Sequence, residues 1–244
     1  MPDPGTVRGF GCDLLVFDLD GTLVDSQQDL ASSVNATLTH MGRLPLNEKE
    51  IAGFIGDGAS MLLSRALEAT GANNDTALKQ ALSFFLSYYR GHKLDTTKVY
   101  PGVLEALRQI QIADPALPMA ILTNKPVGPS VSICDGLGLS PFFFANFGGD
   151  SFPTKKPDPL GLRTLMQKAS LLRGFEVAPE RTVLVGDSHV DVETARAAGS
   201  LSLGCDYGLD PVRLHAARPD AAVSSPGEWS SALQTLFQAN GDRT

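Results

Sequence analysis

Two aspartates follow the first apolar run of the chain and stand one residue apart. Leu14–Phe17 form the run, and Asp18 and Asp20 come directly after it in the segment Asp18–Thr22, which reads DLDGT. Side chains two positions apart on an extended backbone point the same way, and two buried carboxylates in one place are unfavourable unless a cation lies between them. The segment therefore indicates metal-assisted phosphoryl transfer to an aspartate nucleophile, although an ordinary Asp-Gly turn after a strand would also explain it.

Three later apolar runs also end in polar side chains. The residues that follow them are Thr123 and Asn124, then Lys155 and Lys156 beside two prolines, and finally Asp187 and Asp191. Each group has an ordinary explanation by itself: a helix cap, a solvated basic pair, or acidic residues in the first turn of a helix. Because ligands of open parallel sheets bind at the carboxyl ends of the strands, we expect all four groups to meet at one edge.

The charges of these groups complement one another. A hydroxyl and turn amides at Thr123 would hold a phosphate oxygen, and a lysine kept rigid by the prolines would point its ammonium inward. Asp187 would complete the shell of Mg²⁺, which prefers oxygen ligands, and Asp191 would face the same opening one helical turn later. A metal ion and one lysine would then offset the carboxylates and bind a dianionic phosphate.

The composition excludes several classes of protein. The chain has 244 residues, of which 43% are hydrophobic, and its 20 basic and 27 acidic residues give a net charge of −7. We expect no nucleic-acid partner, because the sequence has no basic run, and no membrane partner, because no apolar run approaches the ~20 residues that span a bilayer. The segment Met1–Gly11 lacks the pattern of a signal peptide. Three widely spaced cysteines favour a reducing cytoplasm, with no disulfide and no zinc site.

Apolar runs alternate with helical patterns outside residues 25–95. We expect strands at 14–17, 119–122, 142–147, 182–185 and 201–203, and helices at 103–112, 127–137, 160–172, 190–198 and 228–238. This alternation predicts an α/β fold with a Rossmann-like, doubly wound parallel sheet covered by helices on both faces. Residues 25–95 carry apolar positions at helical spacing, which predicts an inserted bundle. We therefore expect a catalytic core of 1–24 and 96–244, with 1–11 as a loose tail, and a helical-bundle cap of 25–95.

The motif residues resemble, in order and spacing, those of the haloacid dehalogenase-like hydrolases. The likeness covers residues 13–206 and rests on the elements Asp-x-Asp-Gly-Thr, Thr-Asn, Lys-Pro and Gly-Asp-Ser-x-x-x-Asp. Asp20 fills the place of the acid/base that marks the phosphatase branch, which disfavours carbon–halogen chemistry. A finer likeness, to the phosphoglycolate phosphatases, rests on the segments 21–26, 54–59, 122–126 and 155–157. Asp158 and the segment 151–153 depart from that pattern and weaken the likeness in substrate more than in chemistry.

The resemblance implies that the protein hydrolyses a phosphate monoester through an aspartyl-phosphate. Asp18 would attack phosphorus, and Asp20 would protonate the leaving alkoxide and then deprotonate the hydrolytic water. Mg²⁺ would be held by the Asp18 carboxylate, the Asp20 main-chain carbonyl, Asp187 and waters.

The resemblance assigns the other motif residues to the substrate. Thr123, Asn124 and Lys156 would bind it, with the Thr123 hydroxyl and the Lys156 ammonium on the phosphoryl oxygens. Lys156 is preferred to Lys155 because it directly precedes the proline. Asp191 would orient Lys156 or a metal-bound water.

The cap would close over the substrate, exclude bulk water and recognise the leaving group. Backbone amides of Gly56 and Gly58 would hold a small carboxylate, as glycine-rich loops can. Arg65 is a second candidate for this role, although an arginine on a helix is more often solvated. The finer resemblance thus implies 2-phosphoglycolate as the substrate and a place in carbohydrate metabolism.

Other functions remain open on the sequence. The enzyme would act on another small metabolite, such as a sugar phosphate, a nucleotide or pyrophosphate, or would be a sugar-phosphate mutase. A regulator that only binds a phosphorylated ligand is disfavoured, because it needs neither a nucleophile nor an acid. A monomer and a homodimer both fit the sequence, and Trp229 and Phe237 would serve a dimer contact or, as we expect, the core.

Overall fold

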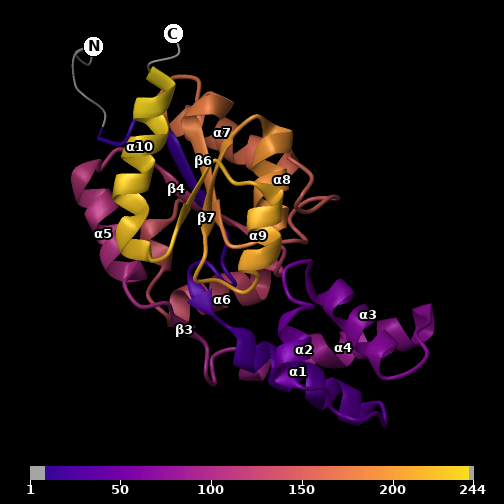
Figure 1. Ribbon diagram of the computed structural model, residues 1–244. Coiled ribbons are helices and arrows are strands. Elements are labelled where there is room, and N and C mark those ends of the chain that lie inside the picture. The colour runs from indigo at the N-terminus through magenta and orange to yellow at the C-terminus, as the bar shows by residue number, and fades with distance from the viewer. Residues whose placement is uncertain (1–8, 242–244) are drawn as a thin grey trace.

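A parallel sheet forms the centre of the larger part of the molecule (Figure 1). The computed structural model describes residues 9–241. Its main sheet has six strands in the order β5-β4-β1-β6-β7-β8, and every neighbouring pair is parallel. The strands are β1 (Leu14–Phe17), β4 (Met119–Leu122), β5 (Ala145–Phe147), β6 (Thr182–Gly186), β7 (Leu201–Cys205) and β8 (Ala221–Val223). The predicted α/β fold is therefore confirmed.

Helices cover both faces of this sheet (Figure 1). The alternating side chains of β1 decide the two layers, since Leu15 and Phe17 pack into one hydrophobic cluster and Leu14 and Val16 into another. The first cluster includes side chains of α5 (Val103–Ala113), α6 (Val127–Gly136) and α10 (Trp229–Gly241). The second includes side chains of α7 (Leu160–Arg173) and α8 (His189–Ala198), and α9 (Pro211–Ala217) lies against α8. β1 is buried on both sides and ends at a defined edge.

Four further helices form a separate bundle beside that edge (Figure 1). They are α1 (Gln27–His40), α2 (Glu48–Ala52), α3 (Ala59–Ala69) and α4 (Asp75–His92). Asn47 and Asn74 begin α2 and α4, because each side chain accepts a backbone N–H of the first turn. The buried faces of the four helices share a hydrophobic cluster of their own, with Phe85 and Tyr89 of α4 among its members. The boundaries of the cap at residues 25 and 95 stay a prediction.

The chain enters and leaves this bundle along two adjacent segments. β2 (Val24–Asp25) and β3 (Lys98–Val99) pair antiparallel, with Val24 opposite Val99. Asp29, in the first turn of α1, fastens the returning segment, because its buried carboxylate accepts hydrogen bonds from the backbone N–H and the hydroxyl of both Thr96 and Thr97. Burial acts to raise the pKa of Asp29, but these hydrogen bonds outweigh it and hold the pKa below its ordinary value.

Several boundaries differ from the expectations for a physical reason. The strand expected at 142–147 begins only at Ala145, because Pro141 starts a 3₁₀ turn over Ser140–Phe142. Phe142 and Phe143 are apolar because they pack against the main core, not because they lie in the sheet. β8 and α9 were missed, since the alanine-rich β8 carries little strand signal.

Phe10 and Trp229, near the two chain ends, and the three cysteines are buried in the main core. The expected loose tail falls mostly on residues 1–8, outside the described residues, whereas Phe10 is buried in the main core. Trp229 is fully buried with its ring 5.2 Å from that of Phe17, which confirms the core explanation. Cys12, Cys134 and Cys205 are all buried and unpaired. Between residues 9 and 241, no helix has both the length and the apolar character needed to cross a bilayer.

We predict that Asp29→Asn lowers the free energy of unfolding by about 2–4 kcal/mol near neutral pH, because it removes the charge that the threonine hydrogen bonds stabilise. The measurement is urea unfolding followed by circular dichroism, with the exposed Asp95→Asn as control. Since the pKa of Asp29 is lowered by folding, its contribution is present above the ordinary carboxyl pKa and is lost as the pH falls through the folded-state pKa. The difference from wild type should therefore shrink toward about pH 3; an unchanged difference would contradict this account.

Candidate active site

The side chains predicted at separate strand ends meet beyond β1. The backbone N–H of Asp18 still donates to Val185 of β6 at 2.9 Å, so its side chain emerges where the strand ends. Lys156 reaches it from the loop after β5, with Nζ 3.0 Å from Asp18 Oδ1 and 2.5 Å from Asp191 Oδ1. Lys156 and Asp191 are buried, and Asp18 is only 7% exposed. The candidate nucleophile, a lysine and a second aspartate thus meet at one largely buried place.

An acidic cluster surrounds Asp18. One carboxylate oxygen from each of Asp18, Asp187 and Asp191 lies within 4.8 Å of the others. Burial raises the pKa of Asp18 to about 6 in spite of the opposing Lys156 ammonium. Burial, together with the Asp18 and Asp191 charges, raises the pKa of Asp187 well above its ordinary value. The cluster is therefore unfavourable in its charged form unless a further cation offsets it.

The residues present fit a divalent metal ion. Asp18 Oδ1 is buried, and although Lys156 forms an ion pair with it, it accepts no well-aligned hydrogen bond. The donor set consists of carboxylate oxygens, which hard divalent cations prefer. With Asp20, four carboxylates meet the ammonium groups of Lys125 and Lys156, so a divalent ion would balance the formal charge.

Asp187 is held by groups on both sides of its carboxylate. Thr22 Oγ1 donates to its Oδ1 at 3.1 Å, and the backbone N–H of Leu209 donates to its Oδ2 at 2.8 Å. Gly21 and Gly208 flank it so closely that a Cβ atom on either would lie about 2.1 or 2.2 Å from an Asp187 side-chain atom. The glycine of the first motif is therefore required both for its positive φ and for this close approach.

Asp191 joins the start of α8 to Lys156. Its Oδ2 accepts hydrogen bonds from the backbone N–H and the hydroxyl of Ser188. The Ser188 side chain accepts the backbone N–H of Asp191 in return, which completes a capping box. Its Oδ1 accepts the Lys156 ammonium. The Asp191 carboxylate thus caps the start of α8 and also fixes the lysine that contacts Asp18.

Asp20 points away from the acidic cluster. Its carboxylate accepts a hydrogen bond from Ser26 Oγ at 2.5 Å and two from Lys125 Nζ at 3.0 and 2.9 Å. Sequence reasoning missed both partners. The available signal was their place within the segments 21–26 and 122–126, which carried the finer resemblance. The metal role predicted for Asp20 involves its main-chain carbonyl, so it stays a prediction.

Thr123 and Asn124 follow β4 and face the space above Asp18. Thr123 is buried, and its hydroxyl accepts the backbone N–H of Lys125 at 3.2 Å, which leaves its hydroxyl hydrogen for another partner. The Asn124 amide donates to Gly56 O of the bundle and to Lys156 O, at 3.2 and 3.1 Å. Asn124 therefore joins the bundle to the core, and its substrate role stays a prediction.

A cavity lies between the bundle and the end of the sheet. It encloses about 540 Å³ of empty space, part of it open to solvent. From the core it is lined by the residues Asp18, Asp20, Thr123, Asn124, Lys125, Pro126 and Pro129, and from the bundle by Leu30, Ile55, Gly56, Gly58, Ala59, Leu62, Phe85, Leu86 and Tyr89. The predicted carboxylate loop, Gly56–Gly58, is thus part of its wall.

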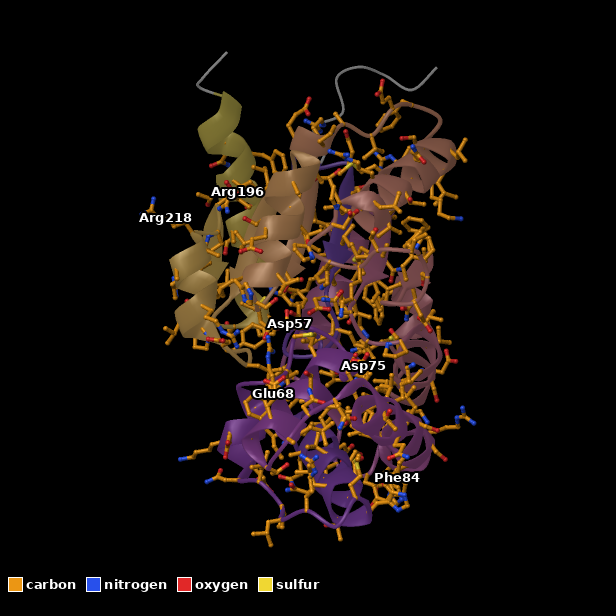
Figure 2. All side chains as sticks on the ribbon, turned by 90° about the vertical axis from the view of Figure 1, so that its right-hand side faces the viewer. Asp57, Glu68, Asp75, Phe84, Arg196 and Arg218 are labelled. Atoms are coloured by element: carbon orange, nitrogen blue, oxygen red, sulfur yellow. The ribbon has the colours of Figure 1, made fainter. Side chains whose placement is uncertain are left out.

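The loop before α3 is fastened to the core. Lys155 Nζ donates to Asp57 O, and Arg213 donates to Gly53 O at 3.1 Å. Figure 2 labels Asp57 at the junction of the bundle and the core. Arg65 does not line the cavity, and its side chain is 28% exposed: it donates to Asp57 Oδ2 at 2.5 Å and to Phe54 O at 3.0 Å. Arg65 therefore shapes the loop from within.

Comparison with known proteins agrees with this geometry. A model of haloacid dehalogenase-like hydrolases matches residues 15–204. The chain is 42% identical to a phosphoglycolate phosphatase of Pseudomonas putida over 214 residues, which are 85% of this chain and 72% of that protein. It is 36% identical to a phosphoglycolate phosphatase of Rhodospirillum rubrum over 237 residues, which are 94% of this chain and 93% of that protein.

A solved structure is also similar. The crystal structure of a predicted phosphoglycolate phosphatase from Haemophilus somnus gives a TM-score of 0.81 at 29% identity, and the match covers 89% of this chain and 96% of that one. The region that matches the family model runs from β1 into β7 and contains Asp18, Lys156 and Asp187. The chain therefore belongs to the haloacid dehalogenase-like hydrolase family.

Proposed function

We propose that this protein is a Mg²⁺-dependent phosphatase that hydrolyses 2-phosphoglycolate to glycolate and phosphate. The observation that carries the proposal is the separation of two neighbouring carboxylates: Asp18 lies in the acidic cluster beside Lys156, whereas Asp20 is turned to Ser26 and Lys125. One carboxylate is thus placed for attack and the other for proton transfer. The two curated relatives named phosphoglycolate phosphatase support the substrate.

The chemistry assigned to the two aspartates balances in two steps. An Asp18 oxygen attacks phosphorus, the bond between phosphorus and the ester oxygen breaks, and Asp20 gives its proton to the leaving alkoxide. Water then attacks the aspartyl-phosphate while Asp20 takes a proton from it, which releases phosphate and restores Asp18. Asp20 borders the cavity from which the leaving group departs, and this position suits both transfers.

The other residues of the site position and neutralise the phosphoryl group. Lys156 is held by Asp191 and directs its ammonium to the Asp18 carboxylate, where the transferring oxygens would lie. Thr123 keeps a hydroxyl hydrogen for a phosphoryl oxygen. Asp18, Asp187 and the Asp20 carbonyl would hold Mg²⁺, which would shield the nucleophile from an anionic substrate and stabilise charge on the transferring oxygens.

The cap contributes by excluding water. Its residues that line the cavity are mostly apolar, and its loop is fastened to the core by Asn124 and Lys155. When a substrate fills such a cavity and displaces its water, electrostatic interactions inside it become stronger and fewer water molecules remain near the intermediate. We further propose that the enzyme is cytoplasmic and acts as a monomer or a homodimer.

We predict that 2-phosphoglycolate is the preferred substrate of the purified protein and that turnover requires Mg²⁺. The measurement is phosphate release from 2-phosphoglycolate, sugar phosphates, nucleotides and pyrophosphate, each with Mg²⁺ and with chelator. Strong preference for another ester would discard the substrate and keep the chemistry. Conversion of a sugar phosphate to an isomer without phosphate release would indicate a mutase, and absence of turnover on every compound would revive a regulator that only binds.

We also predict that Asp20→Asn lowers kcat for 2-phosphoglycolate by about 10²–10⁴-fold, because general acid–base catalysis contributes this much. With p-nitrophenyl phosphate, whose leaving group needs no proton, the variant should release p-nitrophenol in a burst and then turn over slowly. Asp75→Asn, at the start of α4 and away from the cavity, is the control. Near-normal rates on both substrates would reject the proton-transfer role of Asp20.

A further inference from the structure

Lys125 is a buried cation, and none of the steps assigned to Asp18, Asp20 and Lys156 gives it a role toward the substrate. It is the single cationic side chain among the described residues that line the cavity. Its ammonium is almost fully buried and donates to both oxygens of Asp20. A permanent positive charge therefore stands beside the proton-transfer residue.

The cap supplies a second donor at the same place. Tyr89 of α4 lies against this ammonium, with Lys125 Nζ 4.8 Å from the centre of the ring. Tyr89 is 2% exposed, and its hydroxyl has no well-aligned hydrogen-bond partner within the described part of the chain. Burial raises the pKa of Tyr89 despite the nearby lysine, so the side chain stays a neutral phenol with a hydrogen to donate.

The hydrogen-bond count leaves capacity at both groups. An ammonium carries three N–H donors: two bond Asp20, and the Tyr89 hydroxyl is within reach of the third, a contact that a ligand carboxylate would take over. The Tyr89 hydroxyl adds its own hydrogen from the cap side of the same place. That hydrogen has no well-aligned acceptor among the described residues, and an acceptor on a bound ligand would satisfy it.

The remaining cap wall has no charge to offer an anion. Leu30, Ile55, Leu62, Phe85 and Leu86 are hydrocarbon surfaces, which would not solvate a carboxylate. The Arg65 guanidinium already donates hydrogen bonds to the Asp57 carboxylate and the carbonyl of Phe54. An anionic leaving group that enters this cavity therefore finds its strongest side-chain partners at Lys125 and Tyr89.

We propose that Lys125 of the core and Tyr89 of the cap together bind the carboxylate of the substrate. This inference rests on the proposed function, because 2-phosphoglycolate places a carboxylate one CH₂ group away from the ester oxygen. When Asp20 reaches that ester oxygen, the ammonium bonded to Asp20 lies beside the carboxylate. Recognition of the carboxylate and placement of the acid are thereby performed by the same lysine, against which the cap brings Tyr89.

The competing location for the carboxylate is the loop before α3. Gly56 and Gly58 line the cavity, and α3 begins after Gly58 without a side-chain cap. The carbonyls of Gly56 and Asp57, however, are the groups that face Asn124 and Lys155 of the core. Binding by the backbone amides alone would leave the substrate preference independent of Lys125 and Tyr89, so a comparison of two substrates separates the locations.

The test compares 2-phosphoglycolate with ethyl phosphate, which keeps the alkyl ester and lacks the carboxylate. In Lys125→Met the ratio of the two kcat/KM values should fall by at least about 30-fold, because a buried charge partner of the carboxylate is lost. If Lys125 acts only by orienting Asp20, both substrates slow equally, the ratio stays unchanged, and the inference is overturned. Circular dichroism and thermal unfolding establish that the variant is folded.

Tyr89→Phe provides an independent variant that keeps the ring over Lys125 and removes only the hydroxyl. The ratio should fall by about 3- to 30-fold, the effect of one lost hydrogen bond to a charged group. Tyr88→Phe is the matched control, because the neighbouring Tyr88 ring stacks on Phe84 and His92 and does not line the cavity. An unchanged ratio in Tyr89→Phe would remove Tyr89 from the carboxylate site.

Failure of this inference is distinguishable from failure of the proposed function. If the wild-type enzyme shows no preference for 2-phosphoglycolate over ethyl phosphate, the proposed substrate is wrong and the inference falls with it. If the wild-type enzyme shows the preference and Lys125→Met retains it, the substrate stands and the carboxylate is bound elsewhere.

Discussion

The structure depends on the way buried negative charge is compensated at the end of β1. Asp18, Asp187 and Asp191 converge there, in surroundings where a carboxylate is held in its charged form only beside a cation. Lys156 neutralises part of this negative charge, and a divalent ion would neutralise the remainder. This imbalance would give the site affinity for a metal and, through the metal and Lys156, for a phosphate dianion.

Much of the surrounding fold serves to keep these groups in place. Alternate side chains of β1 pack into two different layers, so the strand is fixed on both faces and its final aspartate has little freedom. Gly21 and Gly208 bring the backbone against Asp187, and the capping box of α8 fixes Asp191. The junction of cap and core is fastened in a comparable way, since Asp29 ties the first turn of α1 to the segment that returns to the core. Cap and core thus meet with defined geometry at the cavity.

The sequence predicted the parts of the site that follow from local pattern. β1 and β4 occupy the expected residues, because four apolar residues followed by polar ones leave little choice of boundary in a buried parallel strand. The meeting of Asp18, Lys156 and Asp187 followed from the rule that strand ends share an edge. The strand expected from residue 142 was wrong because a run of phenylalanines signals burial without specifying which element is buried.

Several side-chain pairings could not be predicted from the local sequence. Nothing in the local sequence indicates that Lys125 would bond Asp20 instead of a phosphate. Nor does it indicate that Tyr89, within the segment expected to form a helical bundle, would cover that lysine. Arg65 has the positive charge expected of a residue that binds an anionic substrate, but it bonds Asp57 and Phe54 and so stabilises a loop. The contact between Lys125 and Tyr89 depends on how two separately packed units approach each other, which neither periodicity nor motif spacing encodes.

The central claim is that Asp18 is the nucleophile, and the most direct test is to trap the covalent intermediate. Enzyme turning over 2-phosphoglycolate with Mg²⁺ would be quenched with acid and treated with borohydride, which reduces an acyl phosphate but not a free carboxylate, and then mapped by peptide mass spectrometry. The account predicts conversion of the side chain at position 18 alone to homoserine, dependent on substrate and absent from Asp18→Asn, which should have no measurable turnover. Reduction at another aspartate, or sustained turnover by Asp18→Asn, would contradict it.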